Sequence, residues 1–582
     1  MDAHNEVKKD GSSSEGSTFR PSIVHGPAEP PLVSLTLGAL LDLQTRKYGS
    51  REALIVRWTG ARWTYKDLCD HSINLAKMLL DVGIRPGDRV GIMAGNCEQY
   101  VCVVFAAARV GAILTVLNNT YTAGEALRAM RHTGCKMLFT TSRIGAVDNK
   151  ILLSQLVHNP DLVPTLEEIV ILYGENDGFR TYDEAIEDGR QLPGDALEEV
   201  QGALGANDIC MLLFTSGSTG NPKAAGLTHH GVVNNARFIG DRMDLKKEDV
   251  LVCPPPLFHC FGLVLGLLAV ITHGAKVVYA SELFDPIATL HAISEERATA
   301  LHGVPAMFDT LFSSRRDGLD LTSLRTGIIA GSPVPKHLMK LMSNEFGMTQ
   351  WTSSYGLTEA SPTCFNATTS DTMERKMNTV GKIMPHAHAK IVDRNGNIVP
   401  VGTRGELCMA GYQLQAGYWL NPEKTAECME LDEDGVLWLH TGDEAVFDSE
   451  GYCTITGRFK DIIIRGGENI YPLEIEDRLV EHPAVERAIV VGIKHARLVE
   501  VVGAFLQRKP GHERPSDEEL RAWTRQTLGR HKSPHHIFWL GEDGLTGEIP
   551  LTGSGKIQKF MLREIGERWL SQRQATAVQP RL

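Results

Sequence analysis

The feature that most constrains the fold is an alternation of short apolar runs with helical patterns, which continues from about residue 35 to about residue 455. Each apolar run is bounded by turn residues and predicts a β-strand. Asp285-Pro286 offers a helix N-cap with proline at the first helical position. Such alternation predicts an α/β fold of parallel-rich sheets covered by helices. The predicted strands are 89–94, 112–117, 136–140, 168–172, 210–214, 250–253 and 275–279.

After Gly457 the pattern becomes smaller and mixed, which predicts a second, compact α+β domain that could act as a lid. Its strands are expected at 462–464, 488–491 and 501–505, and its helices at 472–480 and 517–529, the last beginning with a Ser516/Glu519 capping box. A chain of 582 residues also exceeds what one hydrophobic core usually spans. The predicted division is a disordered extension (1–34), a large N-terminal domain (35–459), a lid domain (460–572) and a tail (573–582).

Composition narrows the class of protein. Hydrophobic residues make up 42% of the chain and charged residues 22%, which is typical of a globular enzyme. A formal net charge of -12 argues against nucleic-acid partners, because such binding needs a basic surface. The scattered cysteines show no zinc-site spacing and are expected to be reduced packing residues. The apolar stretch 257–273 is too short for a membrane span and predicts a buried helix, and the N-terminus lacks the pattern of a signal or transit peptide.

Two glycine- and serine-rich loops, each with a lysine, lie far apart in the chain. The first runs Thr215-Ser216-Gly217-Ser218-Thr219-Gly220-Asn221-Pro222-Lys223 and the second Gly553-Ser554-Gly555-Lys556. Glycines let a backbone approach an anion closely, while hydroxyls, free N–H groups and a lysine can bind phosphate oxygens. The first loop differs from the Walker pattern because Pro222 precedes its lysine. The pair predicts two domains that close on one nucleotide.

Further segments between these loops carry nucleotide-binding chemistry. Tyr355 offers an aromatic face for a base, Thr358 a hydroxyl for a phosphate, and Glu359 a carboxylate for Mg²⁺, which favours one or two carboxylates plus substrate phosphates. Asp443, in His440-Thr441-Gly442-Asp443, could accept both hydroxyls of a ribose, and Arg458 adds a cation. Each residue alone is as typical of an ordinary turn or helix start, so the inference depends on their joint occurrence.

Together these segments resemble the adenylate-forming superfamily of acyl-CoA synthetases, adenylation domains and luciferases, over about residues 35–570. The resemblance implies two steps in one active site. A carboxylate and ATP give an acyl-adenylate and pyrophosphate, and a thiol then displaces AMP. The implied roles are pyrophosphate gripping by 215–223, adenine binding by Gly331-Ser332-Pro333 and Tyr355-Gly356, α-phosphate contact by Thr358, Mg²⁺ ligation by Glu359, ribose binding by Asp443 and Arg458, a hinge at Lys460, and carboxylate and α-phosphate contact by Lys556.

The resemblance also bears on the thiol acceptor. Gly466-Gly467 matches the glycine pair beside the pantetheine tunnel, and 532–534 resembles a further family segment, so coenzyme A is the expected acceptor. Two alternatives stay open: an acyl-AMP ligase that loads a carrier protein, and a nucleotide-binding relative without catalysis. The stretch 494–500 departs from the family pattern and keeps only Glu500, and Ala224 replaces a usual glycine.

For the acid, amino-acid-activating relatives carry an aspartate where this chain has Phe258-His259, which favours a fatty or other apolar acid. His259 matches the family's gating residue, although a satisfied core histidine would show the same pattern. The finer likeness is to the medium-chain fatty acyl-CoA ligase branch and to fungal ligases of secondary metabolism. Pro580-Arg581-Leu582 approximates the peroxisomal Ser-Lys-Leu signal, so a peroxisomal import receptor is an expected partner. The alternative is a frayed tail on a cytoplasmic protein.

Overall fold

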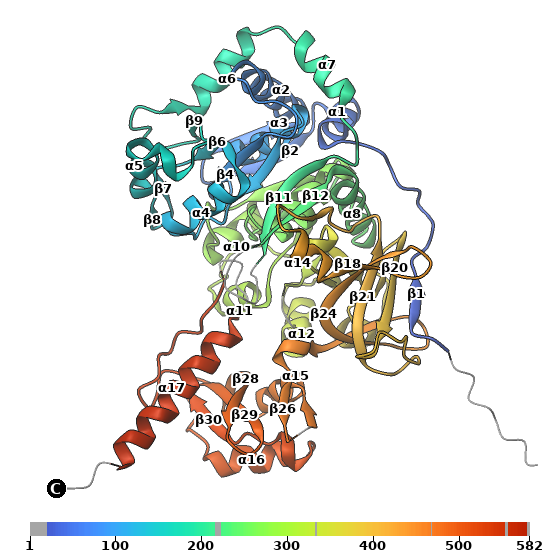
Figure 1. Cartoon of the computed structure of the whole chain (residues 1–582), viewed down its shortest axis with the longest axis vertical. Coiled ribbons are helices and arrows are strands. Elements are labelled where there is room, and N and C mark those ends of the chain that lie inside the picture. The colour runs from blue at the N-terminus through green and yellow to red at the C-terminus, as the bar shows by residue number, and fades with distance from the viewer. Residues whose placement is uncertain (1–19, 216–222, 332–333, 467, 553–556, 579–582) are drawn as a thin grey trace, which may run out of the picture.

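The computed structural model describes residues 20–215, 223–331, 334–466, 468–552 and 557–578. Figure 1 shows two parts, a large one built by the N-terminal three quarters of the chain and a smaller one built by the C-terminal segment, coloured orange to red. In the described residues, three large sheets form the first part and a fourth sheet forms the second. The α/β class with a large and a small domain is therefore confirmed.

The first large sheet is parallel over most of its width. Its strands follow the order β10-β9-β6-β4-β5-β11-β12-β22, and the pairs from β10 to β11 are parallel, whereas β12 runs antiparallel to β11. The predicted strands in this region are confirmed to within a residue or so at each end. In sheet order the bounds are Arg180–Thr181, Glu168–Ile171, Cys135–Thr140, Arg89–Met93, Ile113–Val116, Ile209–Thr215, Lys223–Thr228 and Gly417–Tyr418.

The second large sheet follows the order β19-β18-β17-β16-β15-β13-β14-β2-β3 and is parallel from β17 to β2. The predicted strands at 250–253 and 275–279 are β13 and β14. In sheet order the bounds are Lys382–Ile383, Thr363–Asn366, Gln350–Gly356, Thr326–Ile329, Ala300–Leu301, Val250–Val252, Lys276–Tyr279, Glu52–Val56 and Ala61–Thr64. Two short strands, β7 (Arg143–Ile144) and β8 (Val147–Asp148), pair separately.

Helices cover these sheets, and one buried core of side chains runs between them. Asp285 accepts the N–H of Ala288 at 2.7 Å and so caps α10, as predicted. The predicted buried helix at 257–273 is confirmed as buried but begins at Phe261, and its first part is the π-helix η2 (Phe261–Leu268). The other helices here are α1 (Leu37–Tyr48), α2 (Tyr65–Asp81), α3 (Glu98–Arg109), α4 (Ala123–Thr133), α5 (Lys150–His158), α6 (Tyr182–Gln191), α7 (Asp195–Ala203), α8 (His229–Arg242), α9 (Ala269–His273), α10 (Pro286–Glu295), α11 (Pro305–Ser313), α12 (Lys336–Glu345), α13 (Met373–Asn378) and α14 (Pro422–Ala426), with short 3-10 turns η1 (Pro160–Leu162) and η3 (Thr358–Ala360).

The third large sheet is antiparallel, which corrects the expected strand–helix alternation up to residue 455. It contains β1 (Ile23–His25), β20 (Ala387–Val392), β21 (Gly405–Gly411), β24 (Leu437–Phe447), β23 (Met429–Leu431) and β25 (Cys453–Arg458). Strands β24 and β25 are joined by the tight turn Asp448–Gly451, and antiparallel neighbours need no crossover helix. Strand β1 forms the edge of this sheet and pairs with β20, so the predicted disordered extension does not reach residue 34 (Figure 1).

The C-terminal part has one sheet, of β27 (Glu468–Ile470), β26 (Ile463–Arg465), β29 (Val499–Arg508), β28 (Val485–His495) and β30 (His536–Trp539). Helix α15 (Pro472–Val480) has the predicted bounds, while α16 (Asp517–Arg525) ends earlier than predicted; η4 (Phe459–Asp461) and η5 (Arg530–Lys532) complete this part. Ser516 accepts the N–H of Glu519 at 3.2 Å, as its N-cap role requires.

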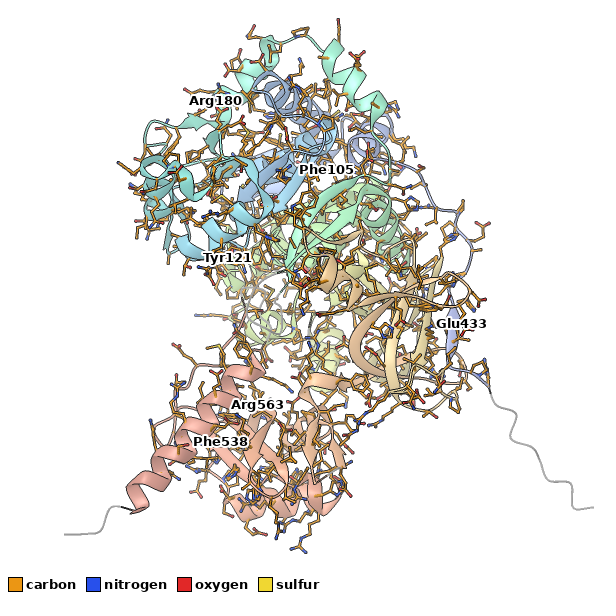
Figure 2. All side chains as sticks on the ribbon, in the orientation of Figure 1. Phe105, Tyr121, Arg180, Glu433, Phe538 and Arg563 are labelled. Carbon is orange, nitrogen blue, oxygen red and sulfur yellow. The ribbon has the colours of Figure 1, made fainter. Side chains whose placement is uncertain are left out.

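The predicted tail at 573–582 is wrong for residues 573–578, which belong to a helix. Helix α17 spans Lys559–Val578, because Leu562 and neighbouring apolar side chains bury against the sheet. Phe538 of β30, which Figure 2 labels, stacks on the ring of Phe505 at 4.4 Å and contacts the ring of Trp569 on α17 at 5.4 Å. Among the helices described, none is long and apolar enough to cross a membrane. No disulfide joins the cysteines in the described residues, and all but Cys428 are buried, as predicted.

Candidate active site

The ends of the first phosphate-type loop lie side by side at the junction of two strands. Thr215 is the last residue of β11, Lys223 is the first of β12, and the two residues pair across the antiparallel ladder. The intervening residues 216–222 lie outside the described part of the chain, so their predicted phosphate contacts stay predictions. The flanking strands nevertheless fix where the loop begins and ends, in the first large sheet.

A single buried carboxylate brings three predicted site residues together. Asp443 is 4% exposed and lies opposite Arg458 on the neighbouring strand β25. Arg458 Nε donates to Asp443 Oδ1 at 2.8 Å, and Tyr355 Oη donates to Asp443 Oδ2 at 2.6 Å. Burial, followed by the charge of Asp443, raises the pKa of Tyr355 far above its ordinary value, so the phenol stays protonated and donates.

This arrangement leaves acceptor capacity on Asp443. An ionised carboxylate has about four lone-pair positions, and Arg458 and Tyr355 use two of them. The charge of Asp443 is the largest cause that raises the pKa of Arg458, which therefore stays a cation. The group can accept two further hydrogen bonds, which is what the two hydroxyls of a ribose would donate.

The predicted metal ligand Glu359 lies in the 3-10 turn η3, which follows directly after β17. Its Oε1 accepts the hydroxyl of Tyr418 at 2.7 Å, and its carbonyl oxygen accepts the N–H of Gln415 at 2.8 Å. The side-chain nitrogen of Lys223 lies 4.6 Å from the ring centroid of Tyr418. Tyr418 therefore stands between Lys223 and Glu359.

These contacts are compatible with Mg²⁺ binding. One half-buried carboxylate near the end of a predicted phosphate-binding loop is a donor set that Mg²⁺ favours, since its other ligands would then be phosphate oxygens and water. The second oxygen of Glu359 would serve as the protein ligand. Sequence reasoning missed Tyr418, because a lone tyrosine in a two-residue strand carries no local signal.

Of the two predicted adenine-binding segments, 331–333 follows β16 and Tyr355-Gly356 forms the end of β17. Gly331 has a φ of 91°, in the left-handed region that favours glycine, and it comes two residues after the end of β16. A Cβ on Gly356 would lie 2.0 Å from the carbonyl oxygen of Pro362, so that position also requires glycine. Ser332 and Pro333 lie outside the described residues.

His259 lies at the start of the π-helix and close to the Thr358 turn. Its Nδ1 accepts the N–H of Phe261 at 3.1 Å, and Cys260 Sγ is 3.8 Å from Thr358 Oγ1. His259 is half-buried rather than enclosed in the core. Its apolar segment therefore reaches the predicted α-phosphate residue, and the gating role of His259 stays a prediction.

A second cluster supports the part of strand β24 that carries Asp443. His440 Nδ1 is 3.0 Å from Glu406 Oε2 and 3.4 Å from Cys408 Sγ. Glu406 Oε1 accepts the N–H of Gly442 at 3.2 Å. The hydrogen bond to Glu406 is the largest cause that raises the pKa of His440. Sequence reasoning missed these partners, because they meet only through the pairing of β21 with β24.

The hinge region connects the two parts of the molecule. Lys460 lies in η4, between β25 and β26. Beyond it, Tyr471 Oη donates to Glu444 Oε1 at 2.8 Å, and Arg487 of β28 pairs with Asp309 of α11 at 3.0 Å. These contacts hold the C-terminal sheet against the N-terminal part in the present arrangement.

The predicted residues on the C-terminal part are only partly described. Gly466 has a φ of 61°, and its N–H donates to the carbonyl oxygen of Leu498 at 2.8 Å. The retained Glu500 accepts the N–H of Ile464 at 2.9 Å, which ties β26 to β29. Gly467 and the Lys556 loop lie outside the described residues, although Leu551 and Ile557 pair across the base of that loop.

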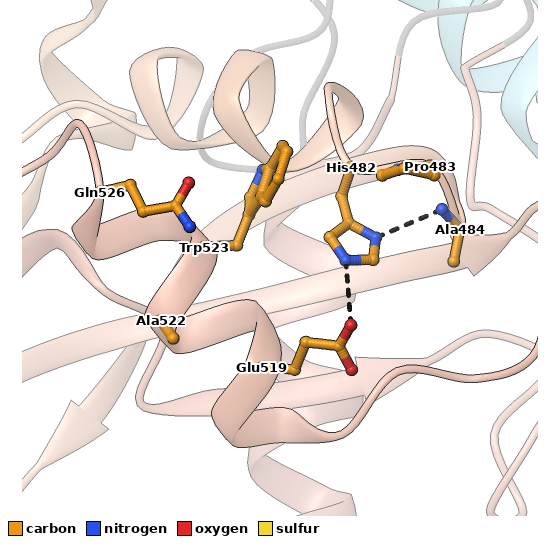
Figure 3. A pocket seen from close by; sticks show the side chains of 7 residues that line it. All are labelled: His482, Pro483, Ala484, Glu519, Ala522, Trp523 and Gln526. Atoms are coloured by element: carbon orange, nitrogen blue, oxygen red, sulfur yellow. Dashed lines mark hydrogen bonds and ion pairs between the residues drawn. The ribbon is translucent and has the colours of Figure 1, made fainter.

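A surface hollow of about 500 Å³ lies elsewhere in the C-terminal part. Figure 3 shows the side chains that line it. Trp523 and Glu519 of α16 line it together with His482, whose ring contacts the Ala484 N–H and the Glu519 carboxylate. None of the predicted site residues lines this hollow. The candidate active site is therefore the region around Lys223, Glu359 and Asp443.

Comparisons with known proteins agree with this site. Residues 41–419 match the family of AMP-binding enzymes, and residues 474–556 match the AMP-binding enzyme C-terminal domain. The chain is 61% identical over 555 residues to an acyl-CoA ligase, sidI, of Beauveria bassiana, which covers 95% of this chain and 96% of the relative. It is 37% identical to the mitochondrial medium-chain acyl-CoA ligase ACSF2 of Bos taurus, over 94% of this chain and 90% of the relative.

Solved structures show the same architecture. ATP-bound MatB from Rhodopseudomonas palustris has a TM-score of 0.79 and 25% identity, and the match covers 92% of this chain and 99% of that one. The anthranilate CoA ligase AuaEII, solved with anthranoyl-AMP, has a TM-score of 0.79 at 24% identity, which indicates a shared fold. The chain therefore belongs to the adenylate-forming AMP-binding enzymes and, within them, to the acyl-CoA ligases.

Proposed function

We propose that this ATP-dependent acyl-CoA ligase activates a fatty or other apolar carboxylic acid as its acyl-adenylate and then transfers the acyl group to coenzyme A. The observation that carries the proposal is the buried Asp443 carboxylate, which holds Tyr355 and Arg458 and keeps two acceptor positions for a ribose. Lys223 and Glu359, joined through Tyr418, are the groups that we propose would bind the phosphates of the same nucleotide.

In the first step, a carboxylate oxygen attacks the α-phosphorus of ATP, and the bond from that phosphorus to the bridging oxygen of pyrophosphate breaks. Two anions must meet, so the chain's main contribution is to position them and to stabilise the developing negative charge. The loop between Thr215 and Lys223 would hold the leaving pyrophosphate, and Thr358 would contact the α-phosphate. Bound Mg²⁺, held by Glu359, would supply positive charge at the phosphate oxygens.

In the second step, the thiol of coenzyme A attacks the acyl carbon, and AMP leaves with the electron pair of the broken carbon–oxygen bond. We propose that Lys556 serves the first step and that rotation about Lys460 removes it for the second. Gly466-Gly467 would then border the pantetheine arm. The acyl-CoA ligases among the relatives support coenzyme A as the acceptor.

The apolar nature of the acid is supported by the segment that meets Thr358. Leu257, Phe258 and Phe261 are each less than 10% exposed, and Cys260 lies 3.8 Å from Thr358 Oγ1. A carboxylate bound beside Thr358 would have its tail among these apolar side chains. Chain length depends on the shape of this lining, because one methylene changes binding by only about 1–3 kcal/mol.

One experiment separates the proposal from its alternatives. Pyrophosphate release and AMP formation are measured over a panel of carboxylic acids, with coenzyme A, with a carrier protein or with neither acceptor. A coenzyme A ligase forms thioester and AMP with coenzyme A. Thioester with the carrier protein alone would favour a stand-alone acyl-AMP ligase, and no pyrophosphate with any acid would favour a non-catalytic relative.

We further propose that Pro580-Arg581-Leu582 directs the protein to peroxisomes through the import receptor for such tripeptides. The support is the sequence alone, because these residues lie outside the described part of the chain.

A further inference from the structure

Tyr418 occupies a position that the nucleotide-binding motifs do not specify. It is 8% exposed and belongs to the two-residue strand β22, which pairs antiparallel with Ala225 and Gly226 of β12. Strand β12 is the strand that leaves the phosphate-type loop at Lys223. The tyrosine thus lies beside the exit of that loop.

The hydroxyl of Tyr418 fixes one oxygen of Glu359. Tyr418 Oη is 2.7 Å from Glu359 Oε1. A phenol hydroxyl can donate a hydrogen bond, whereas an ionised carboxylate only accepts, so Tyr418 is the donor and Glu359 is its acceptor. The other carboxylate oxygen, Oε2, is left in a fixed orientation in which it can bind a metal.

The ring of the same residue supports Lys223. The Lys223 nitrogen lies 4.6 Å from the ring centroid, within the range of a cation–π contact. This contact holds the lysine at the base of the loop without neutralising its charge. The lysine can therefore turn from the ring to an incoming phosphate while Glu359 keeps its orientation.

The backbone around Tyr418 ties these two groups together. Ala416 N–H donates to Gly226 O at 2.8 Å, and Trp419 N–H donates to Ala224 O at 2.8 Å, so both flanks are held to β12. Gln415 N–H donates to the carbonyl oxygen of Glu359 at 2.8 Å. Segment 415–419 therefore joins the exit strand of the phosphate loop to the turn that carries Glu359.

We propose that Tyr418 is a positioning residue that holds Glu359 for Mg²⁺ through its hydroxyl and Lys223 for the nucleotide phosphates through its ring. This inference rests on the proposed ATP-dependent function. Groups that hydrogen-bond a metal ligand commonly change metal affinity by about 10- to 100-fold when removed. The two roles reside in different atoms of one side chain, so substitutions can separate them.

The test compares Tyr418→Phe with Tyr418→Leu in the full-length protein. Tyr418→Phe keeps the ring and removes the hydroxyl, and it should weaken Mn²⁺ binding in the presence of ATP, measured by electron paramagnetic resonance, by about 10-fold. The KM for ATP at saturating Mg²⁺ should stay near the wild-type value. Tyr418→Leu removes the ring as well, and it should also raise that KM.

Tyr452→Phe is the matched control, because Tyr452 Oη donates to the carboxylate of Asp371 at 2.8 Å in another part of the molecule. Tyr452→Phe should change neither the Mn²⁺ affinity in the presence of ATP nor the KM for ATP. Thermal unfolding of each variant shows whether the protein is folded. If Tyr418→Phe binds Mn²⁺ as Tyr452→Phe does, the proposed role of the hydroxyl is wrong.

A double-mutant cycle with Glu359→Gln tests whether Tyr418 acts through Glu359. The loss of Mn²⁺ affinity in the double variant should be smaller than the sum of the two single losses, because both changes affect one interaction. Additive losses would overturn the inference. A wild-type protein that forms no acyl-adenylate would instead contradict the proposed function, so the two failures are distinguishable.

Discussion

Replacing Asp443 with asparagine tests the ribose site with little change in side-chain shape. Asp443 is 4% exposed, and each of its oxygens accepts one hydrogen bond, from Arg458 and from Tyr355. An asparagine presents an NH₂ group at one of these two positions, so one donor would face another donor. Of the two remaining acceptor positions, the one on the NH₂ group would be lost, and the one on the carbonyl oxygen would lose the negative charge that strengthens a hydrogen bond from a ribose.

The expected loss of ATP affinity in Asp443→Asn follows from these contacts. A hydrogen bond to a charged group contributes about 1.5–3 kcal/mol, and about 1.4 kcal/mol corresponds to a tenfold change in affinity. Arg458 is 64% exposed, so its ion pair with Asp443 adds little. Losing the charge-assisted bond to one ribose hydroxyl should therefore weaken ATP binding by roughly 10- to 100-fold.

The assay is ATP binding by isothermal titration calorimetry, compared for ATP, 2′-deoxyATP and 3′-deoxyATP. The wild-type protein should discriminate against both deoxy analogues, and Asp443→Asn should discriminate much less. The matched control is Asp371→Asn, because Asp371 accepts hydrogen bonds from Tyr452 and from the Thr368 N–H away from the site. Full discrimination retained by Asp443→Asn would refute the assignment of Asp443 to the ribose.

Three other predictions concern Lys556, the Glu406–His440 pair and the C-terminus. Lys556→Ala should slow adenylation by on the order of 10²- to 10³-fold while sparing thioester formation from supplied acyl-AMP; separate assays of the half-reactions check this, and equal losses would contradict it. Because Glu406 raises the pKa of His440, their pair should stabilise the fold at low pH and lose this effect as pH rises through that raised pKa. Urea unfolding at a series of pH values should show that Glu406→Gln makes the free energy of unfolding depend less on pH. The same pH dependence in the variant and the wild type would disprove this role of the pair. A fluorescent fusion of the protein should reach peroxisomes and lose this location when Pro580-Arg581-Leu582 is deleted. The same cellular distribution with and without the tripeptide would show that it is not a targeting signal.

The parallel part of the fold could be predicted from sequence because its information is local. Strands such as 89–94 and 210–214 are apolar runs between turn residues, and the Asp285-Pro286 cap marks a helix start without tertiary context. The antiparallel sheet was missed, since its strands depend on partners far along the chain. Strand β1 exists through pairing with β20, and α17 through burial against β28 and β30.

The candidate site was predicted through the resemblance rather than from single residues. Asp443, Arg458 and Tyr355 are each ordinary in isolation, and the structure brings them together at one carboxylate. Tyr418 and Glu406 could not be predicted, because their contacts arise from strand pairing between segments without a recognisable motif. The sequence therefore predicted residues that would contact a nucleotide, and the structure identified the residues that hold those side chains in place.

The most direct test of the central claim is the stoichiometry of the complete reaction. Purified protein is incubated with ATP, Mg²⁺, coenzyme A and an apolar carboxylic acid, and AMP, pyrophosphate and acyl-CoA are quantified by liquid chromatography with mass spectrometry. The account predicts that the three products form in equal amounts and that none forms without the acid. Formation of ADP and phosphate in place of AMP and pyrophosphate would contradict it.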